Sequence, residues 1–152
     1  VIGAVVAGGG TLLAGVEAAL EAIPDNSDCH KAIQFARSQT ASASGGAVIR
    51  ERYQHLNVVH TVNNLALVIW ALLRHPDDFS AAIGDVVAEG LDTDCNGATV
   101  GALWALQGKA IPMHWLAPWD DAIGVSLAGQ AVLNLEDLVT RTLAVEVSLR
   151  AS

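Results

Sequence analysis

Two acids, a thiol and an amide follow one another in the stretch GLDTDCNG, residues 90–97. Asp92 and Asp94 are one residue apart, so a turning backbone lets both carboxylates point toward one cation. Carboxylates this close repel each other unless a cation or hydrogen-bond donors compensate them. The motif therefore predicts either a site for a hard divalent cation or the N-terminal cap of a following helix, and the motif alone leaves both open.

The surroundings of this motif favour the metal interpretation. Strongly apolar segments lie on both sides of it, where uncompensated charge is costly. Gly90 and Gly97 permit a compact backbone around whatever fills the space. Carboxylate oxygens are ligands that Mg²⁺ prefers. We therefore expect Asp92 and Asp94 to ligate magnesium, with Thr93 and Asn96 shaping the loop.

A second polar cluster interrupts an otherwise apolar helical segment. His60, Asn63 and Asn64 lie close together, and His60 and Asn64 are four residues apart, so they share a helix face. They either line a ligand site or bond to loop backbones and buried water. We take His60, Asn63, Asn64 and Asn96 as candidates for substrate binding, with the structural interpretation left open.

The elements that must position these residues are all expected to be helices. Apolar runs rich in Ala and Leu exceed the usual strand length and alternate with short Pro, Gly, Ser and Asp stretches. Ser27 or Asn26, and Asp77 or Asp78, are expected to cap helices. The predicted helices span residues 1–23, 27–37, 58–73, 79–89, 98–106 and 134–149, with a short one near Gly124. Residues 48–55 are expected to form a brief helix or a turn.

The glycines and the apolar first segment lead to predictions about helix packing. Gly97 and Gly101 are four residues apart, a spacing that lets a neighbouring helix approach closely. Residues 8–10 are three glycines, for which we expect a use in close helix packing. Residues 1–22 are apolar but lack a basic start and contain two glutamates, which favours a buried helix over a signal peptide or membrane span.

Composition limits the classes of partner. The 152 residues suit one domain, and 52% hydrophobic against 16% charged residues indicates either broad burial or a surface covered by a partner. The net charge of -8 argues against nonspecific nucleic-acid binding. Cys29 and Cys95 show neither metal-ligand spacing nor a disulfide framework, so we expect reduced thiols in a cytoplasmic protein. We also expect that the protein does not bind membranes.

Three segments together resemble the ADP-ribosylglycohydrolase family. They are VHTVNNLALVIWALL, DFSAAIGDVVAEGLDTDCNGATVGALWALQG and IPMHWLAPWDD, and the resemblance covers nearly the whole chain. It implies a compact, orthogonal, all-α bundle of many helices. It also implies hydrolysis of a glycosidic bond of ADP-ribose or a related ribosyl group, on protein or small-molecule substrates, with two Mg²⁺ ions.

The resemblance also implies roles for single residues. Asp92 and Asp94 match the family's C-terminal metal motif, in which the following residue is commonly Ser or Thr and supplies an oxygen. Here it is Cys95, whose soft thiol is a poor Mg²⁺ ligand. The alternative to an enzyme is a non-catalytic structural or binding relative, as the jellyfish crystallins that resemble this family are.

The family's N-terminal acidic motif has no counterpart in these residues. We therefore expect residues 1–152 to be the C-terminal portion of a single domain. The N-terminal portion, or a partner chain, would supply the remaining metal ligands and the general acid or base. The chain alone is then expected to be inactive.

Overall fold

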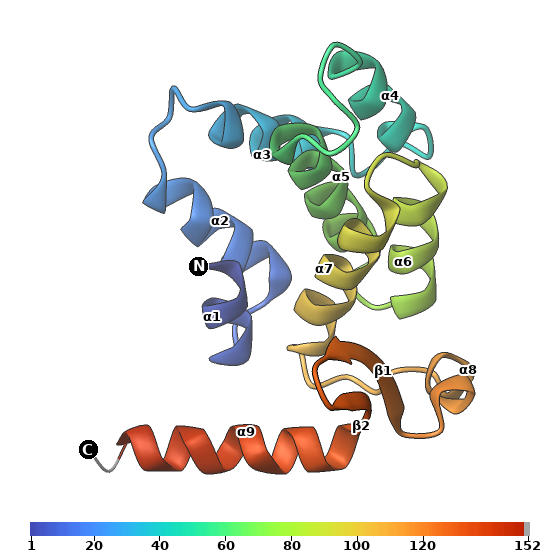
Figure 1. Ribbon diagram of the computed structural model, residues 1–152. Coiled ribbons are helices and arrows are strands. Elements are labelled where there is room, and N and C mark those ends of the chain that lie inside the picture. Colours follow the sequence, from blue (N-terminus) through green and yellow to red (C-terminus); the bar gives the residue numbers. More distant parts are fainter. Residues whose placement is uncertain (151–152) are drawn as a thin grey trace. The chain divides into compact units, whose positions relative to one another are not determined.

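The computed structural model describes residues 1–150 and is mostly helical (Figure 1), with 64% helix and one two-stranded sheet. The predicted all-α class is confirmed. The chain divides into two compact units, with the boundary between Ala110 and Ile111. None of the helices within residues 1–150 is long and apolar enough to cross a membrane.

The first unit is built around one buried helix. Helix α5 has ten buried residues among its 14 and contacts α2, α3, α4, α6 and α7. The predicted core helix is thus confirmed, although it begins at Thr61 because His60 is its N-terminal cap. The helices of this unit are α1 Ile2–Ala7, α2 Leu12–Ala22, α3 Asp28–Ser38, α4 Gly45–Arg52, α5 Thr61–Arg74, α6 Phe79–Ala88 and α7 Thr93–Ala105.

The predicted single first helix is wrong, because the glycine run divides it into α1 and α2. Gly9 has φ +92°, a conformation that costs little only for glycine. A Cβ on Gly10 would lie 2.7 Å from Val5 Cγ1, so the chain passes too close for a side chain. The glycines therefore form a tight turn, and the two apolar helices pack against each other.

Two helix starts confirm the capping pattern. The side chains of Ser27 and Asp78 accept hydrogen bonds from the backbone N–H groups of His30 and Ala81, at 3.2 and 2.9 Å. Each cap satisfies a backbone donor that the first helical turn leaves unpaired. These boundaries follow from local sequence, because the capping oxygen lies only three residues from its donor.

Helices α6 and α7 lie side by side and both contact α5 (Figure 1). Gly97 and Gly101 of α7 face α6, but a Cβ on each would lie 3.5 Å from Val87 Cγ2 and 3.6 Å from Ile83 Cδ1. Those are ordinary contact distances. The prediction that these two glycines permit unusually close packing is therefore wrong.

The second unit contains the only sheet within residues 1–150. The predicted short helix near Gly124 is wrong: β1 pairs antiparallel with β2, with Gly124 opposite Val132. Gly129 has φ +75° in the tight turn between them, and Ile and Val in β1 suit an extended backbone. The elements of this unit are α8 Met113–Leu116, a 3-10 turn Ala117–Trp119, β1 Ala122–Leu127, β2 Gln130–Asn134 and α9 Leu135–Arg150.

Candidate active site

The acidic motif lies at the start of α7. This helix begins at Thr93, five residues earlier than the predicted residue 98, so the motif forms its first turn. Gly90 and Leu91 precede it with φ +77° and +63°. A left-handed conformation costs a residue such as Leu91 roughly 1–2 kcal/mol. The turn from α6 into α7 is therefore strained just before Asp92, and such strain is found at functional sites.

The motif brings three potential metal ligands together. One carboxylate oxygen each of Asp92 and Asp94 and the Cys95 sulfur all lie within 4.8 Å of one another. Asp92 is half-buried, and the other two residues are exposed. Within residues 1–150, no Lys or Arg nitrogen lies within 4.0 Å of either carboxylate. Two neighbouring acids thus lack a cationic side chain as partner.

Hydrogen bonds and charge within the cluster shift two pKa values. A hydrogen bond with the Asp92 side chain, and then the backbone N–H groups of Asp94 and Cys95, lower the pKa of the Asp94 carboxyl. The Asp92 carboxylate, through a hydrogen bond and its charge, raises the pKa of the Cys95 thiol. The three groups therefore interact directly with one another.

Helix capping does not account for Asp92. It occupies the N-cap position of α7, but its side chain accepts no capping hydrogen bond. Ser27 and Asp78, in contrast, accept such bonds at the starts of α3 and α6. Asp94 lies in the first turn of α7, where the positive end of the helix dipole stabilises its carboxylate. The cap interpretation thus explains at most one of the two carboxylates.

A buried amide ties the motif to α5. Asn64 Oδ1 accepts hydrogen bonds from the backbone N–H of Asp92 at 3.2 Å and from Asn96 Nδ2 at 2.7 Å. Asn64 Nδ2 donates to the carbonyls of Val58 at 2.8 Å and His60 at 2.9 Å. Asn64 and Asn96 are 9% and 3% exposed, so this network is shielded from water. It fixes the backbone from which Asp92 projects.

The other predicted polar residues also bond to backbone. Asn63 is 1% exposed, its Oδ1 accepts from the N–H of Asn64 at 2.9 Å, and its Nδ2 donates to the Asn57 carbonyl at 3.0 Å. His60 Nδ1 accepts from the N–H of Val62 at 3.2 Å and caps α5. The structure thus brings His60, Asn63 and Asn64 to the end of α5 that faces the motif, where they shape the backbone.

A cavity of about 270 Å³ lies beside the motif. It adds two hydroxyls that the sequence interpretation missed, those of Thr61 and Thr99. Thr99 Oγ1 donates to the Cys95 carbonyl at 2.8 Å, four residues earlier. Helical spacing would have revealed Thr99 if the start of α7 had been placed correctly. The cavity is lined by Val59, Thr61, Asn64, Leu65, Val68, Asp92, Cys95, Asn96 and Thr99.

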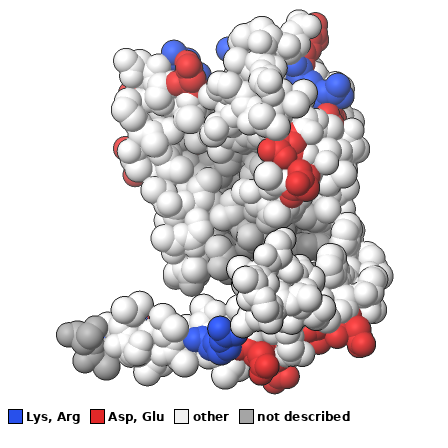
Figure 2. All heavy atoms as spheres, in the orientation of Figure 1, with Lys and Arg blue, Asp and Glu red and all other residues white. Residues whose placement is uncertain are grey.

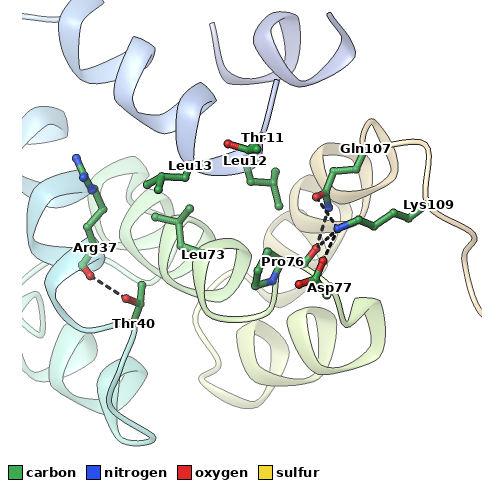
Figure 3. Close-up of a pocket in the computed structure, with 10 residues that line it drawn as sticks. All are labelled: Thr11, Leu12, Leu13, Arg37, Thr40, Leu73, Pro76, Asp77, Gln107 and Lys109. Carbon is green, nitrogen blue, oxygen red and sulfur yellow. Dashed lines mark hydrogen bonds and ion pairs between the residues drawn. The ribbon is translucent and has the colours of Figure 1, made fainter. Parts of the chain in front are cut away.

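A larger cavity, of about 610 Å³, lies near the C-terminal ends of α5 and α7 (Figure 3). Its basic side chains already have acidic partners: Lys109 Nζ lies 2.6 Å from Asp77 Oδ1, and Arg37 lies 3.4 Å from Glu17. The cavity is lined by Thr11, Leu12, Leu13, Arg37, Thr40, Leu73, Pro76, Asp77, Gln107 and Lys109. Its size alone does not make it the reactive centre, because its charges are neutralised.

Charged side chains are sparse elsewhere too. Most of the face drawn in Figure 2 is neither acidic nor basic, and acidic side chains form small patches on it. The chain carries 16 acids against 8 bases.

The donor set decides which metals suit the motif. Asp92 and Asp94 offer hard oxygen ligands, which suit Mg²⁺, Ca²⁺ or Mn²⁺. Mg²⁺ takes six ligands in an octahedron, so two carboxylates must be completed by water, substrate or further groups. The Cys95 sulfur suits a softer ion. The residues present fit a divalent cation, and the thiol is the ligand that suits Mg²⁺ least.

These helices and the acidic motif at the start of α7 define a mostly helical protein with a candidate divalent-metal centre. The model of the ADP-ribosylglycohydrolase family matches residues 1–147. The chain belongs to the ADP-ribosylglycohydrolase family. No curated protein and no solved structure matches it at a significant level. Membership supports a glycohydrolase that acts on ADP-ribose-related groups.

Proposed function

We propose that this chain is part of a magnesium-dependent hydrolase that cleaves a glycosidic bond of ADP-ribose or a related ribosyl group. Family membership supports the glycohydrolase class. The observation that carries the metal is the pair Asp92 and Asp94, which lie in one cluster without a basic partner within residues 1–150. Two adjacent carboxylates in that state attract a divalent cation.

Asp92 and Asp94 would hold the metal, taken here as a pair of Mg²⁺ ions. Bound Mg²⁺ supplies Lewis-acid polarisation and orients substrate oxygens. The chain's own contribution is to position the backbone of the two aspartates: Asn64 holds the Asp92 backbone, and the first turn of α7 sets that of Asp94. A backbone held in this way reduces the reorganisation that cation binding requires.

The cavity beside the cluster is proposed to take the ribose. Its polar lining groups include Thr61, Asn64 and Thr99, with Asp92 at the same wall. His60, Asn63, Asn64 and Asn96 remain our candidates for substrate binding, through hydrogen bonds to ribose hydroxyls or through the loop that they shape. At about 270 Å³ the cavity is smaller than complete small-molecule sites, which span roughly 300–1,000 Å³.

We infer that groups outside residues 1–152 complete the site. The size of the cavity and the incomplete metal donor set both support this. Val58 and Val59 are 57% and 65% exposed next to the cluster, an apolar surface that an additional segment would cover. The expected source is an N-terminal portion of the same domain or a partner chain, which would also supply the general acid or base.

A first test measures the effect of Mg²⁺ on thermal unfolding of the purified protein. A cation that binds only the folded state raises the free energy of unfolding by about 2.7 kcal/mol at 100 times its Kd. We expect a rise in Tm with Mg²⁺ that Asp92→Asn and Asp94→Asn abolish. If Mg²⁺ leaves the Tm of the wild type unchanged when the whole site is present, the metal proposal is wrong.

A second test measures turnover of an ADP-ribosylated substrate by the chain together with the N-terminal portion or partner chain that is expected to complete the site. Asp94→Ala should lower kcat/KM by at least about 100-fold, because even residues that only support metal ligands cost 10–100-fold. Asp77→Ala is the matched control, since Asp77 is an exposed acid at the other end of α5 and should leave kcat/KM unchanged. Full activity of Asp94→Ala would contradict the proposed function, and an inactive wild type that still binds Mg²⁺ would favour a non-catalytic relative.

A further inference from the structure

The least expected member of the metal cluster is a thiol. Cys95 is exposed, it forms no disulfide, and its sulfur lies within 4.8 Å of a carboxylate oxygen of both Asp92 and Asp94. It also lines the cavity beside the motif, so a ligand that enters the cavity meets it. The thiol is therefore a member of the donor set and is accessible to a bound ion.

The donor set changes the choice of metal. Sulfur binds borderline and soft ions such as Zn²⁺ and Co²⁺ far better than Mg²⁺, which requires oxygen. A site with two carboxylate oxygens and one sulfur in reach of one another offers Zn²⁺ three of the four ligands of a tetrahedral centre. Water or substrate would supply the fourth.

We propose that Cys95 makes one position of this centre a mixed oxygen and sulfur site that prefers a divalent transition ion, Zn²⁺ or Co²⁺, to Mg²⁺. The proposal rests on the proposed function, because it assumes that Asp92 and Asp94 hold a cation. When the metal–sulfur bond forms, the thiol proton passes to solvent and no electron is transferred. A transition ion would therefore compete with Mg²⁺ for this position.

The position in the helix supports this geometry. Cys95 lies in the first turn of α7, one residue after Asp94, and Thr99 bonds to its carbonyl one helical turn later. The neighbouring Asn96 is 3% exposed and bonded to Asn64, so the backbone on both sides of the sulfur is fixed. The sulfur and the carboxylates thus project from a backbone that hydrogen bonds hold in place.

Cobalt substitution tests the proposal directly. A Co²⁺ ion bound to thiolate gives a near-ultraviolet charge-transfer band that oxygen ligands alone do not give. We expect the purified protein to show this band with Co²⁺, and Cys95→Ser to lose it. Cys29→Ser is the matched control, since Cys29 is the other free cysteine, on α3, and its replacement should leave the band unchanged.

Competition binding provides a second readout. Cys95→Ser should lower the ratio of Zn²⁺ to Mg²⁺ affinity by at least about tenfold, because serine replaces sulfur with a hard oxygen. The proposal is wrong if the wild type lacks the band while Mg²⁺ still raises its Tm, or if Cys95→Ser keeps the band. Failure of the proposed function would look different, since Mg²⁺ would then leave the Tm of both proteins unchanged.

Discussion

Charged side chains are paired at one end of the α5 and α7 pair and lack basic partners at the other. At the C-terminal ends, Trp104 Nε1 donates to the carbonyl of His75 at 3.2 Å, which joins α7 to α5. Arg74 Nε lies 3.3 Å from Asp85 Oδ2, and Lys109 pairs with Asp77. Each of these charged groups has a partner of opposite sign, so this end has the character of a structural joint.

The N-terminal ends are joined by neutral groups. The amides of Asn64 and Asn96 make the connection, and the charges of Asp92 and Asp94 are left without a basic partner within residues 1–150. Neutral amides can be buried with all their hydrogen bonds made, whereas a buried charge needs a counter-charge. Asp92 is half-buried and Asp94 is exposed, so water solvates these carboxylates, and the cation of the proposed function would bind them from solution.

The largest expected effect on stability comes from removing the neutral joint. Asn64→Ala deletes an amide that makes hydrogen bonds to Val58, His60, Asp92 and Asn96, and it leaves buried donors unpaired. We expect the free energy of unfolding to fall by about 2–4 kcal/mol, because each unsatisfied buried group costs about 1–3 kcal/mol. Urea denaturation measures this loss. A change below about 1 kcal/mol would show that the amide network does not hold the two helices together.

A smaller effect of opposite sign is expected at Gly97, in the first turns of α7. A Cβ there would lie 3.5 Å from Val87 Cγ2, which is an ordinary contact. Gly97→Ala should therefore raise the free energy of unfolding by about 0.5–1 kcal/mol, the helix propensity difference between the two residues. Gly45→Ala is the contrasting control, since its Cβ would clash with the backbone carbonyl oxygen of Gln39. A destabilising Gly97→Ala would mean that α6 and α7 need a glycine at this position.

The smallest effect is expected at the charged joint. Lys109→Ala removes the ion pair with Asp77, whose side chain is 84% exposed. Exposed ion pairs contribute roughly 0–1 kcal/mol and are screened by salt. Urea denaturation at low and high salt should show a loss below about 1 kcal/mol that shrinks as salt increases. A loss as large as that of Asn64→Ala would remove the contrast between the two ends.

Local patterns predicted much of the helical structure. Ser27 and Asp78 begin helices as predicted, because a cap and its donor are neighbours in sequence. The core character of α5 follows from apolar residues on every face. Two errors arose where a turn was misjudged: the glycine run that divides the first helix, and Gly129, which allows residues 122–134 to form a hairpin. A third concerned Gly97 and Gly101, which pack against α6 at ordinary contact distances.

The sequence alone was enough to identify the acidic pair, the unusual cysteine and the family, because those depend on the types of adjacent residues. It did not reveal that Asn64 holds the Asp92 backbone 28 residues away. It also did not reveal that the paired charges, such as Lys109 with Asp77, lie at the other end of the helix pair. Such contacts depend on how α7 packs beside α5. That packing is determined by the burial of many apolar side chains along both helices, and no short stretch of sequence specifies it. The side chains that fix the candidate metal centre were therefore assigned by the fold, through a network that no local spacing encodes.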